Sequence, residues 1–252
     1  MQIERKSLQK NIVIFIHGFM SSPRVFDYLA AQVKEYGYDV DFVTLAGHDD
    51  TIYKFFKTPS KRWSSDVDEY INKMRLEYDN IVLITHSMGG LISINHLVEN
   101  CEKIRHIIAI ALPVNIMPRL RLIKSCLIYT FTNSSADKYV AAMRKQAGIQ
   151  KITFYNSPLL IPKTIAFFRL SNLTKIKISK LTVPITVINS SDDEMVSSRS
   201  LWHIKRIKEN LNLIELKHSG HFWFEETERE IVKDAVIAVL KDNSPQTSPD
   251  SL

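Results

Sequence analysis

The chain of 252 residues predicts an α/β fold, in which a mainly parallel β-sheet is covered by helices on both faces. Short β-branched runs alternate along the chain with longer segments of helical periodicity, and this alternation is typical of parallel sheets. Residues that favour helix starts and stops, such as Pro23 and Gly37, flank the longer segments. A hydrophobic content of 45% and a charged content of 24% are ordinary for a globular chain with a large core.

The first half of the chain contains four expected strands and three expected helices. The run 12–17 is β-branched and aromatic, which predicts a buried strand. Ser21-Ser22-Pro23 begins a helix that ends at Gly37, and the next strand is 38–45. Helical periodicity over 63–78, capped by Ser64 or Ser65, is followed by a strand at 80–85, a helix at 88–100 and a strand at 104–112.

The second half resumes the alternation only after a long interruption. Strands are expected at 183–189 and 211–217, and helices at 197–210 and 226–241. Residues 243–252 are rich in serine, proline and polar residues and predict a disordered tail. We therefore expect a core of residues 1–112 and 181–242, into which residues 113–180 are inserted.

The inserted segment is helix-leaning and basic. Between residues 113 and 182 there are 12 basic residues and one acid, Asp137, so this stretch carries +11 while the whole chain carries +6. The rest of the chain therefore carries −5, an asymmetry that indicates a separate surface role for the segment. Its position predicts that it lies over the carboxyl edge of the sheet, where open α/β folds bind ligands.

A sharp turn between a strand and a helix is expected at Thr85-His86-Ser87-Met88-Gly89. Such a turn holds a serine hydroxyl clear of the backbone, and it requires small residues two positions before and after the serine. Gly89 meets this requirement, but Thr85 stands where glycine is usual. The alternative interpretation is that Ser87 caps an ordinary helix.

With this motif the chain resembles the α/β-hydrolase family, and most of all its small carboxylesterase and monoacylglycerol-lipase branch. Five motifs stand in the family's order over about residues 11–241: Phe15-Ile16-His17-Gly18-Phe19, Ala46-Gly47-His48-Asp49, Thr85-His86-Ser87-Met88-Gly89-Gly90, Ser191-Asp192-Asp193-Glu194-Met195-Val196 and Ser219-Gly220-His221. The resemblance implies an α/β-hydrolase fold with residues 113–180 as a helical lid.

The resemblance also implies a Ser-His-Asp triad, with Ser87 as nucleophile and His221 as base. Asp193 matches the family's acid, although Asp192 remains an alternative. The oxyanion hole would take the backbone N–H groups of Phe19 and Met88.

Three other histidines near these motifs have structural interpretations. His17 is expected to organise its loop and His48 to be structural, while His218 belongs to the end of the last strand. An isolated histidine is more often structural than catalytic, and only the position of His221 after the final strand reverses that expectation.

The lid composition suggests an apolar acyl pocket beneath a basic outer face. That face would meet an anionic membrane surface or an acidic substrate, or it is simply a solvated face over an ordinary core. No cofactor or metal is expected, because the eight histidines are scattered and no His-Glu-x-x-His pair occurs. No nucleic-acid module is recognisable, and the oligomeric state is not predicted.

The compartment is expected to be cytoplasmic. The N-terminus has no signal-peptide pattern, and the apolar run 12–16 is too short to span a bilayer. Cys101 and Cys126 suggest no disulfide framework and are expected to be buried or half-buried thiols.

The primary hypothesis is a serine hydrolase that cleaves short or medium acyl esters, or monoacylglycerols, through an acyl-enzyme. An acyl thioesterase is the nearest alternative, because the same triad serves thioesters. A non-hydrolytic enzyme of the same fold and a non-catalytic binding protein are the other two hypotheses.

Overall fold

The computed structural model of the chain describes residues 9–48, 51–133, 136–149, 152–208 and 211–243. Six parallel strands form one sheet in the order β2-β1-β3-β4-β5-β6. The strands are β1 (Asn11–Ile16), β2 (Asp39–Val43), β3 (Asn80–His86), β4 (Ile104–Ile110), β5 (Ile185–Ser190) and β6 (Leu211–Leu216). The predicted fold class is confirmed, and every expected strand is present.

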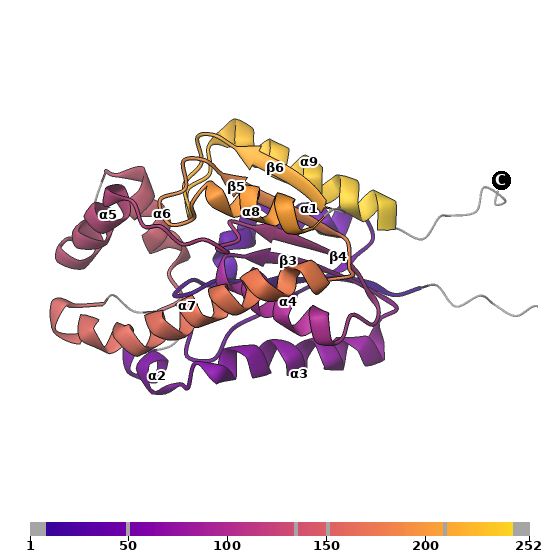
Figure 1. Cartoon of the computed structure of the whole chain (residues 1–252), viewed down its shortest axis with the longest axis horizontal. Coiled ribbons are helices and arrows are strands. Elements are labelled where there is room, and N and C mark those ends of the chain that lie inside the picture. The colour runs from indigo at the N-terminus through magenta and orange to yellow at the C-terminus, as the bar shows by residue number, and fades with distance from the viewer. Residues whose placement is uncertain (1–8, 49–50, 134–135, 150–151, 209–210, 244–252) are drawn as a thin grey trace, which may run out of the picture.

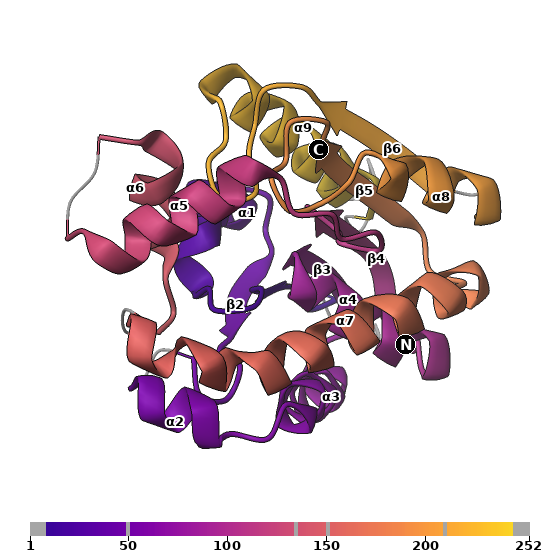
Figure 2. The ribbon, with the colours of Figure 1, turned by 60° about the vertical axis from the view of Figure 1, so that its left-hand side comes forward.

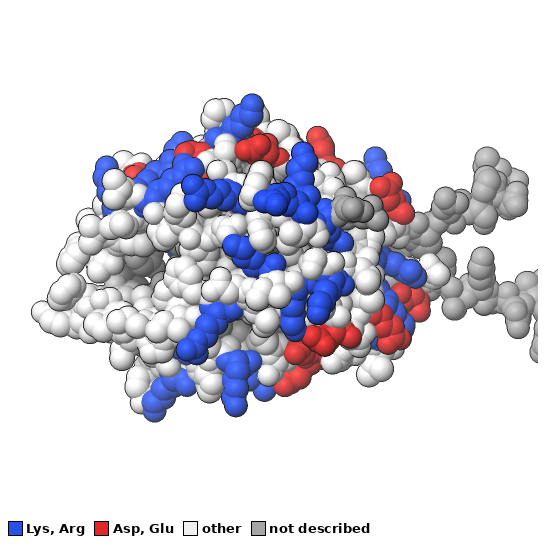
Figure 3. Space-filling view, viewed as in Figure 1, with Lys and Arg blue, Asp and Glu red and all other residues white. Residues whose placement is uncertain are grey.

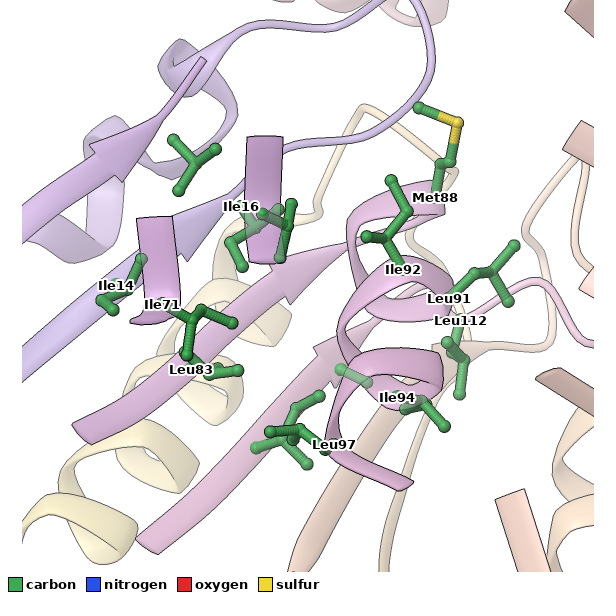
Figure 4. Packing of buried hydrophobic residues seen from close by; sticks show 14 of the residues in the cluster. Ile14, Ile16, Ile71, Leu83, Met88, Leu91, Ile92, Ile94, Leu97 and Leu112 are labelled. Carbon is green, nitrogen blue, oxygen red and sulfur yellow. The ribbon is translucent and has the colours of Figure 1, made fainter. Parts of the chain in front are cut away.

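The central strands are buried on both faces, as their continuous apolar runs require. All residues of β1, β3 and β5 are buried, and the register places Leu83 of β3 between Ile14 of β1 and Ile107 of β4. Figure 4 shows Ile14 and Leu83 beside Ile71, together with the apolar side chains that α4 (Met88–Glu99) contributes to the same cluster. Met88 begins this helix, near the carboxyl ends of the strands.

Helices cover both faces of the sheet, as predicted. The helices α3 (Lys61–Glu77), α4 and α8 (Arg199–Ile207) contribute to one hydrophobic cluster, and α1 (Asp27–Glu35) and α9 (Glu226–Asn243) contribute to the other. Figure 1 shows the sheet between these two layers. No helix among the described residues has the length and apolarity needed to cross a membrane.

Several local predictions need correction. The helix expected from Pro23 to Gly37 begins as a 3-10 turn, η1 (Pro23–Phe26), before α1. A short helix that was not expected, α2 (Ile52–Lys57), begins where the Thr51 side chain accepts a hydrogen bond from the Lys54 backbone. Cys101 and Cys126 are exposed rather than buried, because Cys101 follows α4 and Cys126 faces a cavity described below.

Residues 113–180 form α5 (Leu120–Phe131), α6 (Lys138–Gln146), η2 (Phe154–Leu159), α7 (Leu160–Lys177) and η3 (Ile178–Lys180). The helices α5 and α6 and the start of α7 project beyond the carboxyl ends of the strands (Figures 1 and 2). The other end of α7 lies along α4, where the Asn95 amide donates to the Thr174 hydroxyl at 2.7 Å. The expected tail, 243–252, lies outside the described residues except for Asn243, which ends α9.

Candidate active site

Ser87 occupies a strained turn between β3 and α4. Its φ of 53° and ψ of −120° lie outside the helical and strand regions, so the residue is not an ordinary helix cap. A Cβ atom on Gly89 would lie 2.2 Å from the carbonyl oxygen of Ile16, so only glycine fits two positions after the serine. The turn thus has the form that the sequence predicts.

Thr85 fits this turn through a hydrogen bond to the neighbouring strand. The side chain is completely buried, and its hydroxyl donates to the Ile108 carbonyl oxygen at 3.1 Å. A Cβ atom on Gly90 would approach the Thr85 hydroxyl oxygen to 3.0 Å, so a second glycine supplies the space that the threonine takes up.

Ser87, His221 and Asp193 form one hydrogen-bonded chain. The Ser87 Oγ lies 3.0 Å from Nε2 of His221, and Nδ1 of His221 lies 2.8 Å from Oδ2 of Asp193. Asp193 lies in the loop after β5 and His221 in the loop after β6, so the ends of β3, β5 and β6 at one edge of the parallel sheet bring the residues together. All three residues are at least 97% buried, since their exposed fractions are 3%, 1% and 1%.

The surroundings of these three residues make the His221 imidazole more basic. Burial alone lowers the pKa of His221, but the Asp193 carboxylate and its hydrogen bond outweigh burial and raise it. For Asp193 the effect of burial has the opposite sign and would raise the pKa. His221 and the backbone N–H groups of Met195 and Val196 nevertheless hold the Asp193 pKa below its usual value. A neutral His221 that donates Nδ1–H to Asp193 has Nε2 free to accept the Ser87 proton.

Asp192 points away from the hydrogen-bonded residues Ser87, His221 and Asp193. Its two carboxylate oxygens pair with Arg119 at 3.1 Å and Arg121 at 2.9 Å, both from residues 113–180. His218 is exposed and follows the end of β6 instead of belonging to it. The geometry brings only Asp193 into hydrogen-bond contact with His221.

The loop after β1 passes directly beside the serine. A Cβ atom on Gly18 would lie 2.9 Å from the Ser87 Cβ, which puts Gly18 in contact with the candidate nucleophile. Phe19 follows Gly18, and Met88 follows Ser87, so both expected oxyanion donors belong to backbone segments that border the hydroxyl.

His17 and His48 hold this loop in place. Nε2 of His17 accepts from the Leu45 backbone at 3.2 Å, and Nε2 of His48 accepts from the Met20 backbone at 3.1 Å. Burial, the largest cause, and the neighbouring His17 lower the pKa of His48 to about 3, so the ring stays neutral and can accept. These positions agree with the structural roles expected for both histidines.

Two neighbours of His221 were not expected from the sequence. Nε2–H of His86 donates to the His221 carbonyl oxygen at 2.9 Å, and Oε2 of Glu194 accepts from the His221 backbone N–H at 2.9 Å. Both side chains are buried. Because they contact His221 across 135 and 27 positions of the chain, no local sequence signal identifies them.

An apolar cavity of about 390 Å³ adjoins the site. Phe19, Met195 and Phe222 line it, and they neighbour Gly18, Glu194 and His221 in the chain. The opposite wall is formed by residues 113–180, including Leu122, Tyr129, Leu160 and Phe167. The Phe19 and Phe167 rings stack at 5.6 Å, so α7 packs directly on the loop beside Ser87.

The described part of the chain holds no cluster of three or more His, Cys, Asp or Glu side chains suited to a metal ion. Ser87, His221 and Asp193 supply a hydroxyl, an imidazole and a carboxylate in sequence. Such a chain can turn a serine hydroxyl into a nucleophile.

Solved structures with the same fold include several lipolytic enzymes. The chain superposes on a structure from a study of LipS and LipT, two metagenome-derived lipolytic enzymes, with 18% identity, a TM-score of 0.72 and coverage of 94% of this chain and 96% of that one. A carboxylesterase structure of the thaumarchaeon Nitrososphaera gargenis has 17% identity and a TM-score of 0.70, and the match covers 92% of each chain. The monoacylglycerol lipase of Paleococcus ferrophilus has 15% identity and a TM-score of 0.64, and the match covers 93% of this chain and 96% of that one.

Identities this low establish a common fold and leave the substrate open. No curated protein sequence gives a significant match to the chain. A family model described as serine aminopeptidase, S33, matches residues 8–228, which is most of the chain. The protein therefore has the α/β-hydrolase fold and belongs to the serine aminopeptidase S33 family of hydrolases.

Proposed function

We propose that the protein hydrolyses carboxylic esters through an acyl-enzyme formed on Ser87. The observation that carries this proposal is the unbroken chain of hydrogen bonds from Ser87 through His221 to Asp193. His221 takes the Ser87 proton while Oγ attacks the ester carbonyl carbon. The same proton then passes to the departing alcohol as the carbon–oxygen bond breaks.

Deacylation repeats these steps with water. His221 removes a proton from water, the resulting hydroxide attacks the acyl carbon, and the proton returns to Ser87 as the carboxylic acid leaves. Asp193 stabilises the imidazolium form of His221 in both halves. The Phe19 and Met88 backbone N–H groups are proposed to bind the oxyanion, a role supported by the contact of Gly18 with Ser87.

The acyl chain is proposed to occupy the apolar cavity beside Phe19. A volume of about 390 Å³ suits a short or medium acyl chain or a monoacylglycerol. Residues 113–180 are proposed to act as a lid over it. The rings of Phe131 at the end of α5 and Phe154 in η2 lie 6.5 Å apart, which supports a lid of two arms that meet at their tips.

The proposed test is a hydrolysis screen with p-nitrophenyl esters of increasing chain length, monoacylglycerols and acyl thioesters. We expect Ser87→Ala to abolish turnover while circular dichroism and the melting temperature stay unchanged. Labelling of the wild type, but not of this variant, by a fluorophosphonate would support the nucleophile. Full activity in folded Ser87→Ala would overturn the proposal.

A thioesterase is the second candidate, and a basic depression of about 320 Å³ favours it. Four cations line the depression, together with the acid Asp27: Arg24, Lys138, Lys145 and Arg229. It shares Gln146 and Phe222 with the apolar cavity, so a phosphate-bearing thioester could place its acyl and phosphate groups in adjoining sites. Preference for coenzyme A thioesters over matched p-nitrophenyl esters would select this candidate.

We also propose that the lid contacts a lipid surface, chiefly through apolar side chains. Most large hydrophobic side chains exposed in the described residues belong to residues 113–180, among them Leu120, Leu127, Phe131, Phe154 and Tyr155. The projecting end is largely free of charge in Figure 3. A large exposed apolar patch is a feature of interaction sites.

The basic residues contribute less than the sequence suggests. Lys163 is buried and its ammonium donates to the Thr58 carbonyl oxygen, while Arg144 donates to the carbonyl oxygens of Asn133 and Thr132. Lys163 thus ties α7 to the segment after α2, and Arg144 ties α6 to the end of α5, so both cations have partners within the protein.

Vesicle co-sedimentation separates the apolar from the electrostatic contribution. We expect binding to neutral vesicles that weakens in Leu127→Ser and Tyr155→Ser and persists in Trp202→Ser, whose side chain is also exposed but lies on α8. Strictly anionic, salt-sensitive binding that ignores these substitutions would refute apolar docking, and equal binding to neutral and anionic vesicles at low salt would exclude an electrostatic role.

A further inference from the structure

Glu194 is a buried carboxylate that contacts the candidate base without belonging to the Ser-His-Asp chain. Its exposed fraction is 0%, and its Oε2 accepts a hydrogen bond from the His221 backbone N–H at 2.9 Å. The His221 carbonyl oxygen is also held, because His86 donates a hydrogen bond to it. The backbone of His221 is therefore held on both sides, independently of the imidazole.

The cation that faces Glu194 comes from the inserted segment. Arg121, at the start of α5, has Nη2 3.6 Å from Oε2 of Glu194 and Nη1 2.9 Å from Asp192. Its guanidinium lies 4.2 Å from the centre of the Tyr139 ring of α6. Arg121 thus joins α5 and α6, which together are called the lid arm, to the loop that carries Asp193.

The histidine loop also touches this arm. A Cβ atom on Gly220 would lie 2.6 Å from Cε1 of Tyr139 and 2.7 Å from Oε2 of Glu194. A larger residue here would displace both groups, so the residue before His221 is packed directly against α6. Residues 113–180 therefore reach the base through two contacts, Arg121 with Glu194 and Tyr139 with Gly220.

We infer that Arg121 and Glu194 form a positioning pair through which the lid arm holds His221 in place for catalysis. This inference rests on the proposed role of His221. Glu194 anchors the His221 backbone, and Arg121 supplies the positive charge that makes a buried anion tolerable there. The next residue along α5, Leu122, lines the apolar cavity, so the helix that contacts the acyl chain also secures the base.

The charges around Glu194 affect the pKa of its carboxyl group and, through that group, the pKa of His221. Burial and the adjacent Asp193 raise the pKa of Glu194, whereas His221 opposes them. Arg121, with Asp192 and Tyr139 beside it, lies 3.6 Å from the Glu194 carboxylate and favours its ionised form, and the Cys126 thiol is a further titratable neighbour. An ionised Glu194 in turn raises the pKa of His221.

The test compares Glu194→Gln and Arg121→Met with Arg119→Met. Glutamine keeps an oxygen for the His221 N–H but loses the charge, and Arg119 binds Asp192 and the Ser191 carbonyl oxygen without contacting the Glu194 carboxylate. We expect kcat to fall about tenfold in the first two variants, because small misplacements of a base cost about this much or more. Arg119→Met should stay within about twofold of wild type on the same scale.

The pH readout distinguishes positioning from general destabilisation. Removal of the Glu194 charge should move the acid limb of kcat/KM to lower pH, and Arg121→Met should move it in the same direction. The double variant should lose no more kcat than Glu194→Gln alone, because Arg121 acts through Glu194. An unmoved acid limb in Glu194→Gln, or additive losses in the double variant, would overturn the inference.

The failure of this inference is separable from failure of the proposed function. NMR titration of the His221 imidazole needs no substrate, and it should show the same downward shift in Glu194→Gln and Arg121→Met. A shift seen in a protein without esterase activity would refute ester hydrolysis and leave the linkage intact. Turnover without any shift would do the opposite.

Discussion

The Thr85 hydroxyl donates a hydrogen bond to the Ile108 carbonyl oxygen, 3.1 Å away on the neighbouring strand β4. This contact explains how a threonine stands two residues before Ser87, where the resembled family has glycine. The side chain is oriented toward the sheet, and Gly90 provides the space in the first turn of α4. Thr85 and Gly90 thus replace the usual glycine by a matched pair.

Thr85→Val should destabilise the turn, because valine retains the volume but leaves the hydrogen bond unmade. We expect the free energy of unfolding to fall by about 1–2 kcal/mol, the usual cost of a lost buried hydrogen bond. Urea denaturation would measure this loss, and Thr85→Ser, which keeps a hydroxyl, is the matched control. Equal stability of the valine variant and wild type would show that the bond contributes nothing.

Features that depend on local pattern were predictable from the sequence. The turn at Ser87 needs small residues at set positions, and the loops that hold Asp193 and His221 follow recognisable strands. The resemblance favours Asp193 over Asp192, but the sequence could not show that only Asp193 contacts His221, because adjacent acids in one loop differ only in orientation. Asp192 is drawn toward Arg119 and Arg121, and those partners lie 73 and 71 positions away.

Other features could not be predicted because they depend on distant packing. Burial of Glu194 depends on the packing of residues 113–180, from which Arg121 faces its carboxylate. The six-residue helix α2 is too short to establish a helical period, and its start depends on a single threonine side chain. Burial of Lys163 likewise needed α7 to be placed against Thr58.

Asp193→Asn should nearly abolish ester turnover, whereas Asp192→Asn should not. An asparagine beside Nδ1 no longer fixes the imidazole tautomer, and in a serine protease the equivalent change costs about 10⁴-fold in kcat. Steady-state kinetics with a p-nitrophenyl ester would compare the two variants, with melting temperatures to check folding. The reverse order of losses would assign the acid to Asp192.

The acid limb of the pH–rate profile should lie above the ordinary histidine value. A protonated His221 cannot accept the Ser87 proton, so kcat/KM falls as pH decreases through the His221 pKa. Because Asp193 raises that pKa, the limb is expected above about pH 6.5, the unperturbed value. A profile that stays flat down to pH 5 would mean that His221 is not the base.

Gly18→Ala should impair catalysis more than folding. The added methyl group would lie 2.9 Å from the Ser87 Cβ and 3.1 Å from the His86 carbonyl oxygen, so the loop carrying the Phe19 N–H must shift. Loss of one oxyanion donor costs about 10²–10³-fold in kcat. Kinetics and thermal unfolding of this variant would be compared, and a fall in melting temperature without loss of kcat would argue against Phe19 as a donor.

Glu228 should stabilise the fold in a pH-dependent way. Its carboxylate accepts from the backbone N–H groups of Lys217, His218 and Ser219 and from the Ser219 hydroxyl, and it thereby fixes the loop that leads to His221. Burial would raise its pKa, but these hydrogen bonds outweigh burial and lower it. The folded chain therefore binds this proton more weakly than the unfolded chain.

The stabilisation should accordingly be complete above the unfolded glutamate pKa of about 4.3 and should disappear as pH falls through the lower folded value. Glu228→Gln is expected to cost about 2 kcal/mol near pH 7, since hydrogen bonds to a charged group are lost, and less near pH 3. Urea denaturation across this range would test the trend, with the exposed Glu226→Gln as control. A deficit that is constant with pH would show that the carboxylate is not ionised in the folded protein.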